Sequence, residues 1–424
     1  MRSCFQIQYR LLIYFSILSS SLFNCAKQFD WVEYRGSMGS GYTGENIHPP
    51  LGLKWKLKLQ ADEMQKKRAF NPPIVIDDII YFGSPDGNFY ALDVDTGYMK
   101  WFVQTKGAVN SVPVADDENV YFGSNDGRVY AVSRLDGQEK WNFYTGQTVQ
   151  SLVARYKDMV IFTSDTGATY FLDLNGKPVF QLPNPVWSHH TFQVYDGIIY
   201  WAPLGRSFGA YDIDKRTFLW TVDISAPYAL WYSFPALDDK LVYFGSSFYK
   251  GLDTELNYYA YDRKSGEPVW QKTDTFDLGS RVEVNQNTIF LDHVELLDYM
   301  APSLWKDLVI FTSGDTKIRA FKKETGEIAW EKKFDYPFSS APTVAGDRIY
   351  VGLQGVKEKT DMGWFGDNPK LLCLSAKDGS VQWQMETDGA VLNSPIISRG
   401  RIMFGTDRNY FYVLEEILSL PILQ

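Results

Sequence analysis

The sequence predicts an all-β fold, an eight-bladed β-propeller of four-stranded antiparallel blades that an N-terminal strand closes by completing the last blade. Three observations carry this prediction: a phrase ending in tryptophan recurs, a glycine-turn phrase recurs upstream of it, and aromatic residues reach 16% of the chain. Tyrosine and phenylalanine favour the pleated surface of a sheet. A repeat of about 40 residues that holds four short strands is typical of a propeller blade.

The first recurring phrase places a small residue ten positions before a tryptophan, with a tight turn between them. The clearest copies run from Ala91 to Trp101 and from Ala260 to Trp270, and both keep an aspartate and a glycine in the turn. One copy is a residue shorter and ends in phenylalanine, and the first keeps only its last strand. The equivalent end positions are Trp55, Trp101, Trp141, Phe180, Trp220, Trp270, Trp330 and Trp383.

The second phrase is a β-rich run followed by an Asp-Gly type turn, as in Tyr81 to Gly87 and Tyr121 to Gly127. Glycine accepts the positive φ that hairpin turns need, so each phrase predicts a hairpin. Counting the phrases gives eight blades within residues 50–416. The last blade takes three strands from residues 394–414 and its fourth from residues 51–59, which would close the ring and hide its open edges.

Residues 1–24 are predicted to be a secretory signal peptide. Their apolar run, Leu11 to Leu18, is shorter than the about 20 residues that a membrane span needs. A leucine three residues before Cys25 resembles a bacterial lipobox, although Asn24 replaces the usual small residue. We therefore expect lipidation at Cys25, with ordinary cleavage nearby as the alternative. Residues 25–49 are predicted to be a linker and residues 417–424 a tail.

Charge and motif content exclude several classes of function. The net charge of −9 argues against a nucleic-acid-binding surface. The three cysteines and four histidines form no metal-ligand spacing, and no P-loop, GxSxG or HExxH motif occurs. Asp93 to Gly97 looks briefly like a calcium loop, but it recurs as a blade turn, and the pair His189-His190 lies near no carboxylate phrase. No catalytic, cofactor-binding or metal-binding residue is assigned.

The phrase A-x-D-x-x-x-G-x-x-x-W resembles the tryptophan-docking repeat of the pyrroloquinoline-quinone-like propellers, over nearly all of residues 50–416. The resemblance implies that each end residue, Phe180 included, docks its blade on the next one. Two classes of protein share this repeat. Quinoprotein dehydrogenases hold pyrroloquinoline quinone and calcium, whereas BamB-type lipoproteins of the outer-membrane β-barrel assembly machinery are not enzymes. Cys373 replaces the small residue of the phrase, so we expect it to be a packing residue.

The predicted innermost strands, such as Ile74 to Ile76, carry no charged side chain and no histidine, and the dehydrogenases' adjacent cysteine pair is absent. These observations favour a scaffold without a cofactor. Pyrroloquinoline quinone and calcium are expected only if the chain is instead a quinoprotein oxidoreductase.

Four insertions interrupt the repeat: Ser247 to Asn257, Leu353 to Lys370, residues 273–299 and residues 61–68. All four fall where turns and links emerge on one face of a propeller, which predicts a working face. The candidate partner residues on it are Met362, Trp364, Phe365, Leu291 and Val294. Aromatic residues dominate interface hot spots, although Trp364 and Phe365 could instead cap the channel of their own ring. Leu291 and Val294 have near-helical spacing, which predicts a short amphipathic helix.

Together these features predict an exported, lipid-anchored and monomeric propeller at the outer membrane, on its periplasmic side or at the cell surface. Its expected partners are proteins, with the β-barrel assembly machinery among the candidates. A quinoprotein oxidoreductase and a surface lipoprotein that binds a glycan or peptide remain alternatives.

Overall fold

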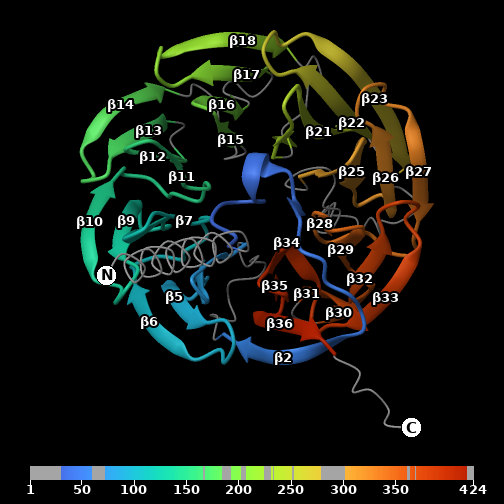
Figure 1. Ribbon diagram of the computed structural model, residues 1–424, viewed down its shortest axis with the longest axis horizontal. Coiled ribbons are helices and arrows are strands. Elements are labelled where there is room, and N and C mark those ends of the chain that lie inside the picture. The colour runs from blue at the N-terminus through green and yellow to red at the C-terminus, as the bar shows by residue number, and fades with distance from the viewer. Residues whose placement is uncertain are drawn as a thin grey trace, which may run out of the picture.

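The computed structural model describes residues 30–59, 72–165, 168–183, 192–201, 207–223, 231–232, 234–250, 253–277, 301–360, 363–367 and 369–417. They form eight antiparallel blades arranged in a ring, as Figure 1 shows. The predicted eight-bladed all-β propeller is therefore confirmed. In this part of the chain the helical element is η1 (Ser37–Gly39), a single 3-10 turn, and no helix is long and apolar enough to cross a membrane.

The first four blades follow one another along the chain, each running from its inner strand to its outer strand. They consist of β3 (Ile74–Ile76), β4 (Ile79–Gly83), β5 (Asn88–Asp93) and β6 (Met99–Gln104); β7 (Val114–Ala115), β8 (Asn119–Gly123), β9 (Arg128–Ser133) and β10 (Glu139–Tyr144); β11 (Ala154–Tyr156), β12 (Met159–Thr163), β13 (Ala168–Asp173) and β14 (Pro178–Pro183); and β15 (Phe192–Tyr195), β16 (Ile198–Trp201), β17 (Ser207–Asp212) and β18 (Thr217–Asp223).

The last four blades depart from this plan in three places: an extra short inner strand, an inserted hairpin and a strand from the start of the chain. They consist of β19 (Trp231–Tyr232), β20 (Ala236–Leu237), β21 (Leu241–Lys250), β22 (Asp253–Asp262) and β23 (Pro268–Asp277); β24 (Ser303–Trp305), β25 (Leu308–Thr312), β26 (Lys317–Lys322) and β27 (Ile328–Lys333); β28 (Thr343–Ala345), β29 (Arg348–Leu353), β32 (Lys370–Ser375) and β33 (Val381–Glu386), with the hairpin β30 (Val356–Thr360) and β31 (Gly363–Asp367); and β34 (Val391–Ser398), β35 (Arg401–Thr406), β36 (Tyr410–Glu416) and β2 (Leu51–Lys58).

The core lies between the blades, because each blade packs its two faces on its neighbours. The second strand of a blade is therefore buried on both faces and reads as a continuous apolar run, as in β8 and β25. Stacked phenylalanines join adjacent blades: the ring centroids of Phe89 and Phe122 lie 4.0 Å apart, as do those of Phe208 and Phe244. The outer strands are largely exposed, as in β6.

A β-bulge precedes the docking residue in all eight blades. The pairing of the third and fourth strands shifts by one residue at this point, so that Lys100 in β6 and Leu219 in β18, for example, have no opposite partner. A bulge raises the local twist and redirects the next side chain. In these blades the bulge directs the docking side chain, an indole in every blade but the third, against the next blade.

Six of the docking tryptophans donate a hydrogen bond from Nε1 to a carbonyl oxygen in the next blade's turn, at 2.7–3.1 Å. The acceptors are Val94, Arg134, Leu174, Arg263, Lys323 and Ala376. The glycine of that turn lies flat against the indole: a Cβ on Gly266, which has φ +73°, would approach Trp220 to 2.5 Å. Glycine is thus required twice, for the positive φ and for the space.

Blade three replaces tryptophan with Phe180, and the following turn replaces glycine with Arg216. These two residues contact each other, since the Arg216 guanidinium carbon lies 4.4 Å from the centroid of the Phe180 ring. Arg216 has a positive φ of 53°, the conformation that glycine adopts in the other turns. A cation–π contact here replaces the contact between indole and glycine.

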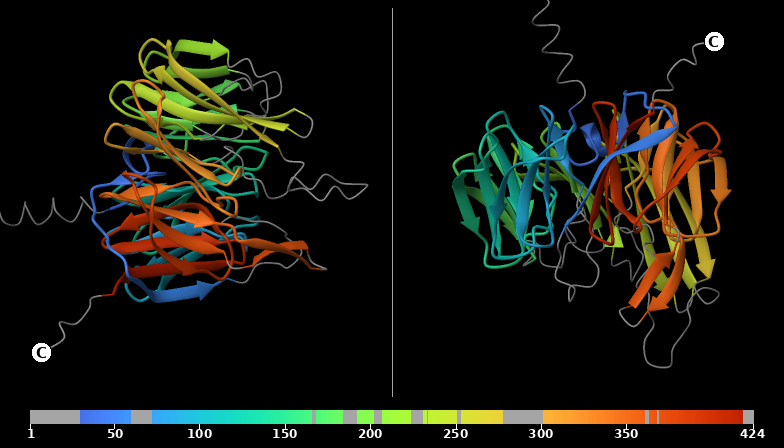
Figure 2. Two further views of the ribbon diagram at one scale, coloured as in Figure 1. Left: turned by 90° about the vertical axis from the view of Figure 1, so that its right-hand side faces the viewer. Right: turned by 90° about the horizontal axis from the view of Figure 1, so that it is seen from below.

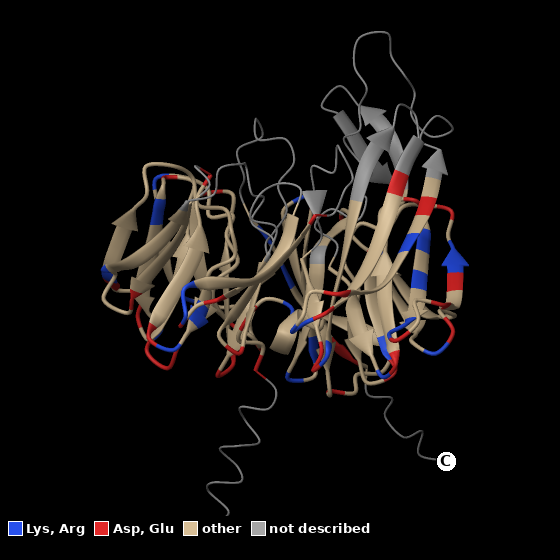
Figure 3. Cartoon of the chain, turned by 90° about the horizontal axis from the view of Figure 1, so that it is seen from above, with Lys and Arg blue, Asp and Glu red and all other residues tan. Residues whose placement is uncertain are grey.

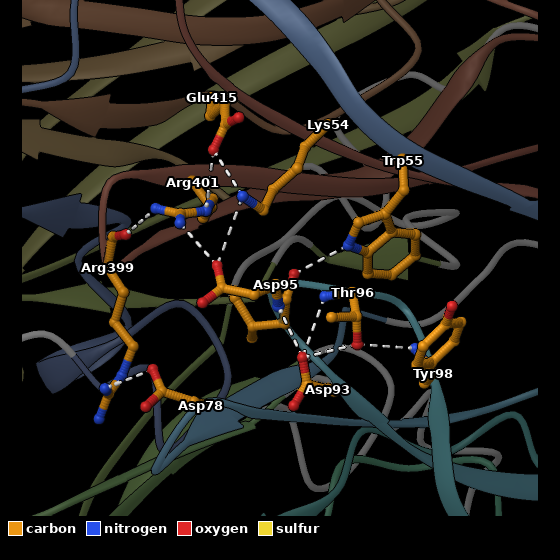
Figure 4. A network of polar contacts seen from close by, with 11 residues as sticks. Lys54, Trp55, Asp78, Asp93, Asp95, Thr96, Tyr98, Arg399, Arg401 and Glu415 are labelled. Carbon is orange, nitrogen blue, oxygen red and sulfur yellow. Dashed lines mark hydrogen bonds and ion pairs between the residues drawn. The ribbon is translucent and has the colours of Figure 1, made fainter.

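Strand β2 closes the ring by pairing antiparallel with β36, from Leu51 opposite Glu416 to Lys58 opposite Tyr410. Figure 4 shows the seam with blade one, where Trp55 reaches the Val94 carbonyl. Beside it, a group of ion pairs crosses between the two blades: Lys54 with Asp95 and Glu415, and Arg401 with Asp95. Closure therefore rests on a strand ladder, a docked indole and a surface charge network.

Residues 30–50, here called the N-terminal strap, cross the ring rather than lying outside it. Trp31 exchanges two backbone hydrogen bonds of 2.9 Å with Val75 of β3. Farther along, β1 (Tyr42–Thr43) pairs in parallel with β28. The strap then reaches the outer rim as β2. The sequence analysis predicted only a linker for residues 25–49.

Replacing residues 51–58 with a Gly-Ser segment of equal length is expected to abolish the single cooperative unfolding transition, because it removes the closing ladder and a docked indole together. Trp55→Ala alone should lower the free energy of unfolding by about 3–5 kcal/mol. The exposed change Leu53→Ser on the same strand is the control and should cost less than about 0.5 kcal/mol. A replaced strand that leaves thermal melting fully cooperative would contradict ring closure by β2.

A double-mutant cycle tests the exchange in blade three. Phe180→Trp should destabilise the protein, because the indole meets the Arg216 side chain, and Arg216→Gly should remove the cation–π contact. The double variant restores the pattern of the other blades, with the Ile213 carbonyl as the indole's acceptor. We expect a favourable coupling of about 1–2 kcal/mol in urea unfolding. Additive effects would show that the two exceptions are independent.

Candidate functional site

The two faces of the ring differ in what they carry. Turns between the first and second strands and between the third and fourth strands form one face, and both ends of the described chain reach it; we call it the terminal face. The turns between the second and third strands and the links between blades form the insertion face. Figure 2 shows yellow and orange strand ends projecting from the ring on this side, away from the side where the chain ends leave.

The first predicted insertion is a strand extension. Strands β21 and β22 have ten residues each and pair without interruption from Leu241 opposite Asp262 to Lys250 opposite Asp253, while β8 and β9 have five and six. Strand β23 continues beside them to Asp277. Blade five therefore extends beyond its neighbours by continued hydrogen bonding.

The second insertion forms the hairpin β30–β31, in which Trp364 is paired with Lys359 and Phe365 with Glu358. Both candidate anchors thus lie on a projecting hairpin. Met362, Leu291 and Val294 lie outside the described residues, as do the helix predicted near residue 291 and the pair His189-His190. Most of the third and fourth insertions lies outside them too.

An ion cluster at the base of the blade-five extension joins it to blade six. The guanidinium of Arg319 is buried and contacts the carboxylates of Asp274 on β23, Asp315 and Glu331 on β27; its Nη2 lies 2.5 Å from Asp274 and its Nε lies 3.0 Å from Glu331. Lys317 lies 3.2 Å from Glu331. We call these five side chains the Arg319 cluster.

The cluster fixes the direction of the extension. Burial would raise the pKa of Asp274, but the charges of Arg319 and Lys317 outweigh it and hold that pKa below its usual value. The carboxylate is therefore ionised at neutral pH. Removing one partner of such a buried group leaves an unpaired charge, so β23 is held against blade six.

The axis of the ring is filled from the terminal face by Tyr34 and Arg35. The Tyr34 ring lies 4.5 Å from that of Phe234. Arg35 is 1% exposed and donates to four neutral oxygens at 2.6–2.8 Å. These acceptors are the carbonyls of Pro302 and Pro342 and the hydroxyls of Ser303 and Ser394, from the inner strands of blades six to eight.

A buried guanidinium without a carboxylate is costly, and desolvation lowers the pKa of Arg35 to about 10. The strap tolerates it because Nη1 and Nη2 donate all four of these hydrogen bonds, although Nε is buried without a partner. A sequence signal existed, since Gly36, Gly39 and Gly41 follow closely; a Cβ on Gly39 would lie 2.8 Å from the Pro235 carbonyl. Such spacing indicates a close approach of backbones.

The remaining candidate ligands have structural roles where the structure describes them. Asp93 accepts hydrogen bonds from the backbone of Asp95 and Thr96, so its carboxylate shapes the blade turn. Cys373 is buried opposite Trp383, and burial raises the pKa of its thiol to about 11. Among the described residues, no group of three histidines, cysteines or acids is placed to hold a metal ion.

The fold and the indole docking define a tryptophan-docking propeller of the quinoprotein class. A family model described as outer membrane protein assembly factor BamB matches residues 52–157, 145–292 and 259–360, more than half of the chain. The chain belongs to this family.

Two curated relatives match short stretches. Quinoprotein alcohol dehydrogenase PedH of Pseudomonas putida is 23% identical over 158 residues, and outer membrane protein assembly factor BamB of Shewanella oneidensis is 28% identical over 89 residues. These stretches cover 36% and 20% of this chain and 22% of either relative, so the chain spans about a fifth of the length of each.

Solved structures show the same fold. BamB from Moraxella catarrhalis aligns over 88% of this chain and 99% of its own, with a TM-score of 0.63 and 17% identity. Quinohemoprotein alcohol dehydrogenase ADHIIG from Pseudomonas putida HK5 aligns over 93% and 82%, with a TM-score of 0.68 and 14% identity. At these identities the likeness concerns the fold alone.

The strap also gives the structure a titratable group near neutrality, since burial raises the pKa of Glu33 to about 7 from an ordinary 4.5. The folded state therefore keeps the proton that the unfolded chain loses, and stability falls as pH rises from 4.5 to 7. Glu33→Gln should remove this dependence and stabilise the protein above pH 7 by about 1–3 kcal/mol.

Urea unfolding between pH 4 and pH 8 measures this effect. Glu324→Gln, an exposed change in a blade turn, is the control and should follow the wild type. Parallel pH profiles for wild type and Glu33→Gln would contradict the placement of Glu33 in the strap.

Proposed function

We propose that the chain is a lipid-anchored, exported scaffold whose insertion face binds a protein partner, and that this partner belongs to the machinery that assembles β-barrel proteins in the outer membrane. The observation that carries the proposal is the asymmetry of the ring. One face has short turns and the strap, and the other has two strands lengthened to ten residues each and a hairpin. The Arg319 cluster holds the extension in place.

Family membership supports the second half of the proposal, since the model that matches is described as an outer membrane protein assembly factor. The signal-peptide pattern and Cys25 support export and anchoring, with the protein at the outer membrane. The domain acts as a monomer, because its closed ring leaves no blade incomplete.

The scaffold proposal assigns no cofactor. The described residues of the axis do not fit pyrroloquinoline quinone with calcium, because Tyr34 and Arg35 fill the axis from the strap side and no group of three His, Cys, Asp or Glu residues is placed there to hold a metal ion. Incubation with pyrroloquinoline quinone and Ca²⁺ that yields a bound chromophore and alcohol oxidation would overturn the scaffold proposal.

The variant Trp364→Ala/Phe365→Ala is expected to stay folded and to lose its partner. Truncating two aromatic anchors on a projecting hairpin removes binding energy, and hot-spot residues each contribute about 2 kcal/mol or more. The measurement is co-purification from detergent-solubilised membranes, with mass spectrometry to identify β-barrel assembly components. Circular dichroism and the melting midpoint should remain those of the wild type.

The matched control is Phe102→Ala/Ile328→Ala, which removes two exposed apolar side chains from the outer strands β6 and β27. It should retain the partner. Loss of the partner in the control but not in the hairpin variant would contradict the insertion face as the binding surface.

A further inference from the structure

Both ends of the described chain are fixed to the terminal face. Asp30 accepts a hydrogen bond of 2.7 Å from Arg399, which lies in the turn between β34 and β35. At the other end, the backbone N–H of Ile417 donates to the Pro50 carbonyl at 2.9 Å. The chain therefore leaves the ring on this face at both ends.

The tether to the proposed anchor is short. Cys25 precedes Asp30 by five residues, which span at most about 18 Å when fully extended. The strap that follows is not a flexible continuation of this tether, because Trp31, Tyr34 and Arg35 are buried in the ring. An acyl chain on Cys25 would thus hold the terminal face within about 18 Å of the lipid headgroups.

The terminal face also carries the two most exposed large apolar side chains of the described residues. Leu135 is 88% exposed and Tyr98 is 76% exposed, and they lie in the corresponding turns of neighbouring blades. Nothing within the ring requires apolar side chains at these turn tips. Tyrosine side chains are enriched at membrane interfaces, where an apolar ring and a hydroxyl are both satisfied.

Charge does not favour this contact. The ribbon in Figure 3 is coloured at acidic and at basic positions along the edge of the terminal face, with acidic positions prominent. Several are paired with each other, such as Lys157 with Asp214 at 2.7 Å and Arg399 with Asp78 at 2.6 Å. Acidic residues outnumber basic ones in the turns that carry Tyr98 and Leu135, with Asp93, Asp95 and Asp136 against Arg134. Charge therefore does not draw this face to the bilayer, and the tether and the apolar tips decide the orientation.

We infer that the terminal face lies against the lipid bilayer, with Tyr98 and Leu135 at the headgroup level, and that the insertion face points away from the membrane. The inference rests on the anchor at Cys25 in the proposed function. It adds an orientation to that function: the blade-five extension and the hairpin would face partners on the side of the ring away from the membrane.

The experiment compares two single-cysteine variants at opposite ends of β10: Leu135→Cys on the terminal face and Gln147→Cys on the insertion face, both at exposed positions. Cys373 is buried and Cys25 carries the lipid, so the introduced thiol takes the fluorophore. The acylated protein is reconstituted into vesicles of phosphatidylethanolamine and phosphatidylglycerol that contain a headgroup spin-labelled lipid. Six residues of strand separate the two labels by about 20 Å, so quenching at residue 135 should exceed that at residue 147 by about threefold.

A second arm removes the dependence on cellular acylation. A chain that begins at residue 26 carries an N-terminal histidine tag and is bound to vesicles with a nickel-chelating lipid, which places the tether at the same point. Mass spectrometry that finds no acyl chain on the exported protein contradicts the anchor of the proposed function, while the tagged arm still tests orientation. Equal quenching of the two labels, or stronger quenching at residue 147, in either arm would overturn the inference.

Discussion

The structure depends on one contact repeated around the ring: an indole that a β-bulge directs against the glycine turn of the next blade. The contact combines a hydrogen bond, as from Trp141 to the Leu174 carbonyl, with a ring face so close that the turn cannot carry a Cβ. Six of the eight blades make this contact with the next blade, so neighbouring blades support one another around most of the ring. Phe180 and Arg216 show that the docking residue and the turn residue beneath it must fit each other, because both depart from the pattern and contact one another.

Closing this ring with a strand from the start of the chain makes the two faces unequal. The chain must cross the ring to reach the outer rim, and the strap that results fills the axis with Tyr34 and Arg35. It also brings both chain ends to one side. The opposite side is then free for insertions, and they extend β21, β22 and β23 and add a hairpin without disturbing the docking contacts.

The fold does not separate the two classes that share it, because a dehydrogenase and an assembly factor align with the chain at similar TM-scores of 0.68 and 0.63. Function has to be argued from side chains at a site and not from the fold. In this chain the described axis is packed from one side by an arginine bonded to neutral oxygens. The insertion face carries an ion cluster whose carboxylates are all paired with Arg319, a structural arrangement and not an open ligand set.

The sequence by itself determined the blade count, the strand pattern and the closure by residues 51–59, because each depends on local spacing that every blade repeats. Only the tertiary structure decided the roles of Glu33, Tyr34 and Arg35, since their burial comes from inner strands up to 359 residues away in sequence. The Arg319 cluster was hidden for the same reason: it joins residues of different blades that no periodic pattern links. A periodic sequence pattern reveals only the contacts that every blade makes. A contact made once, across the axis or between two particular blades, produces no periodic pattern.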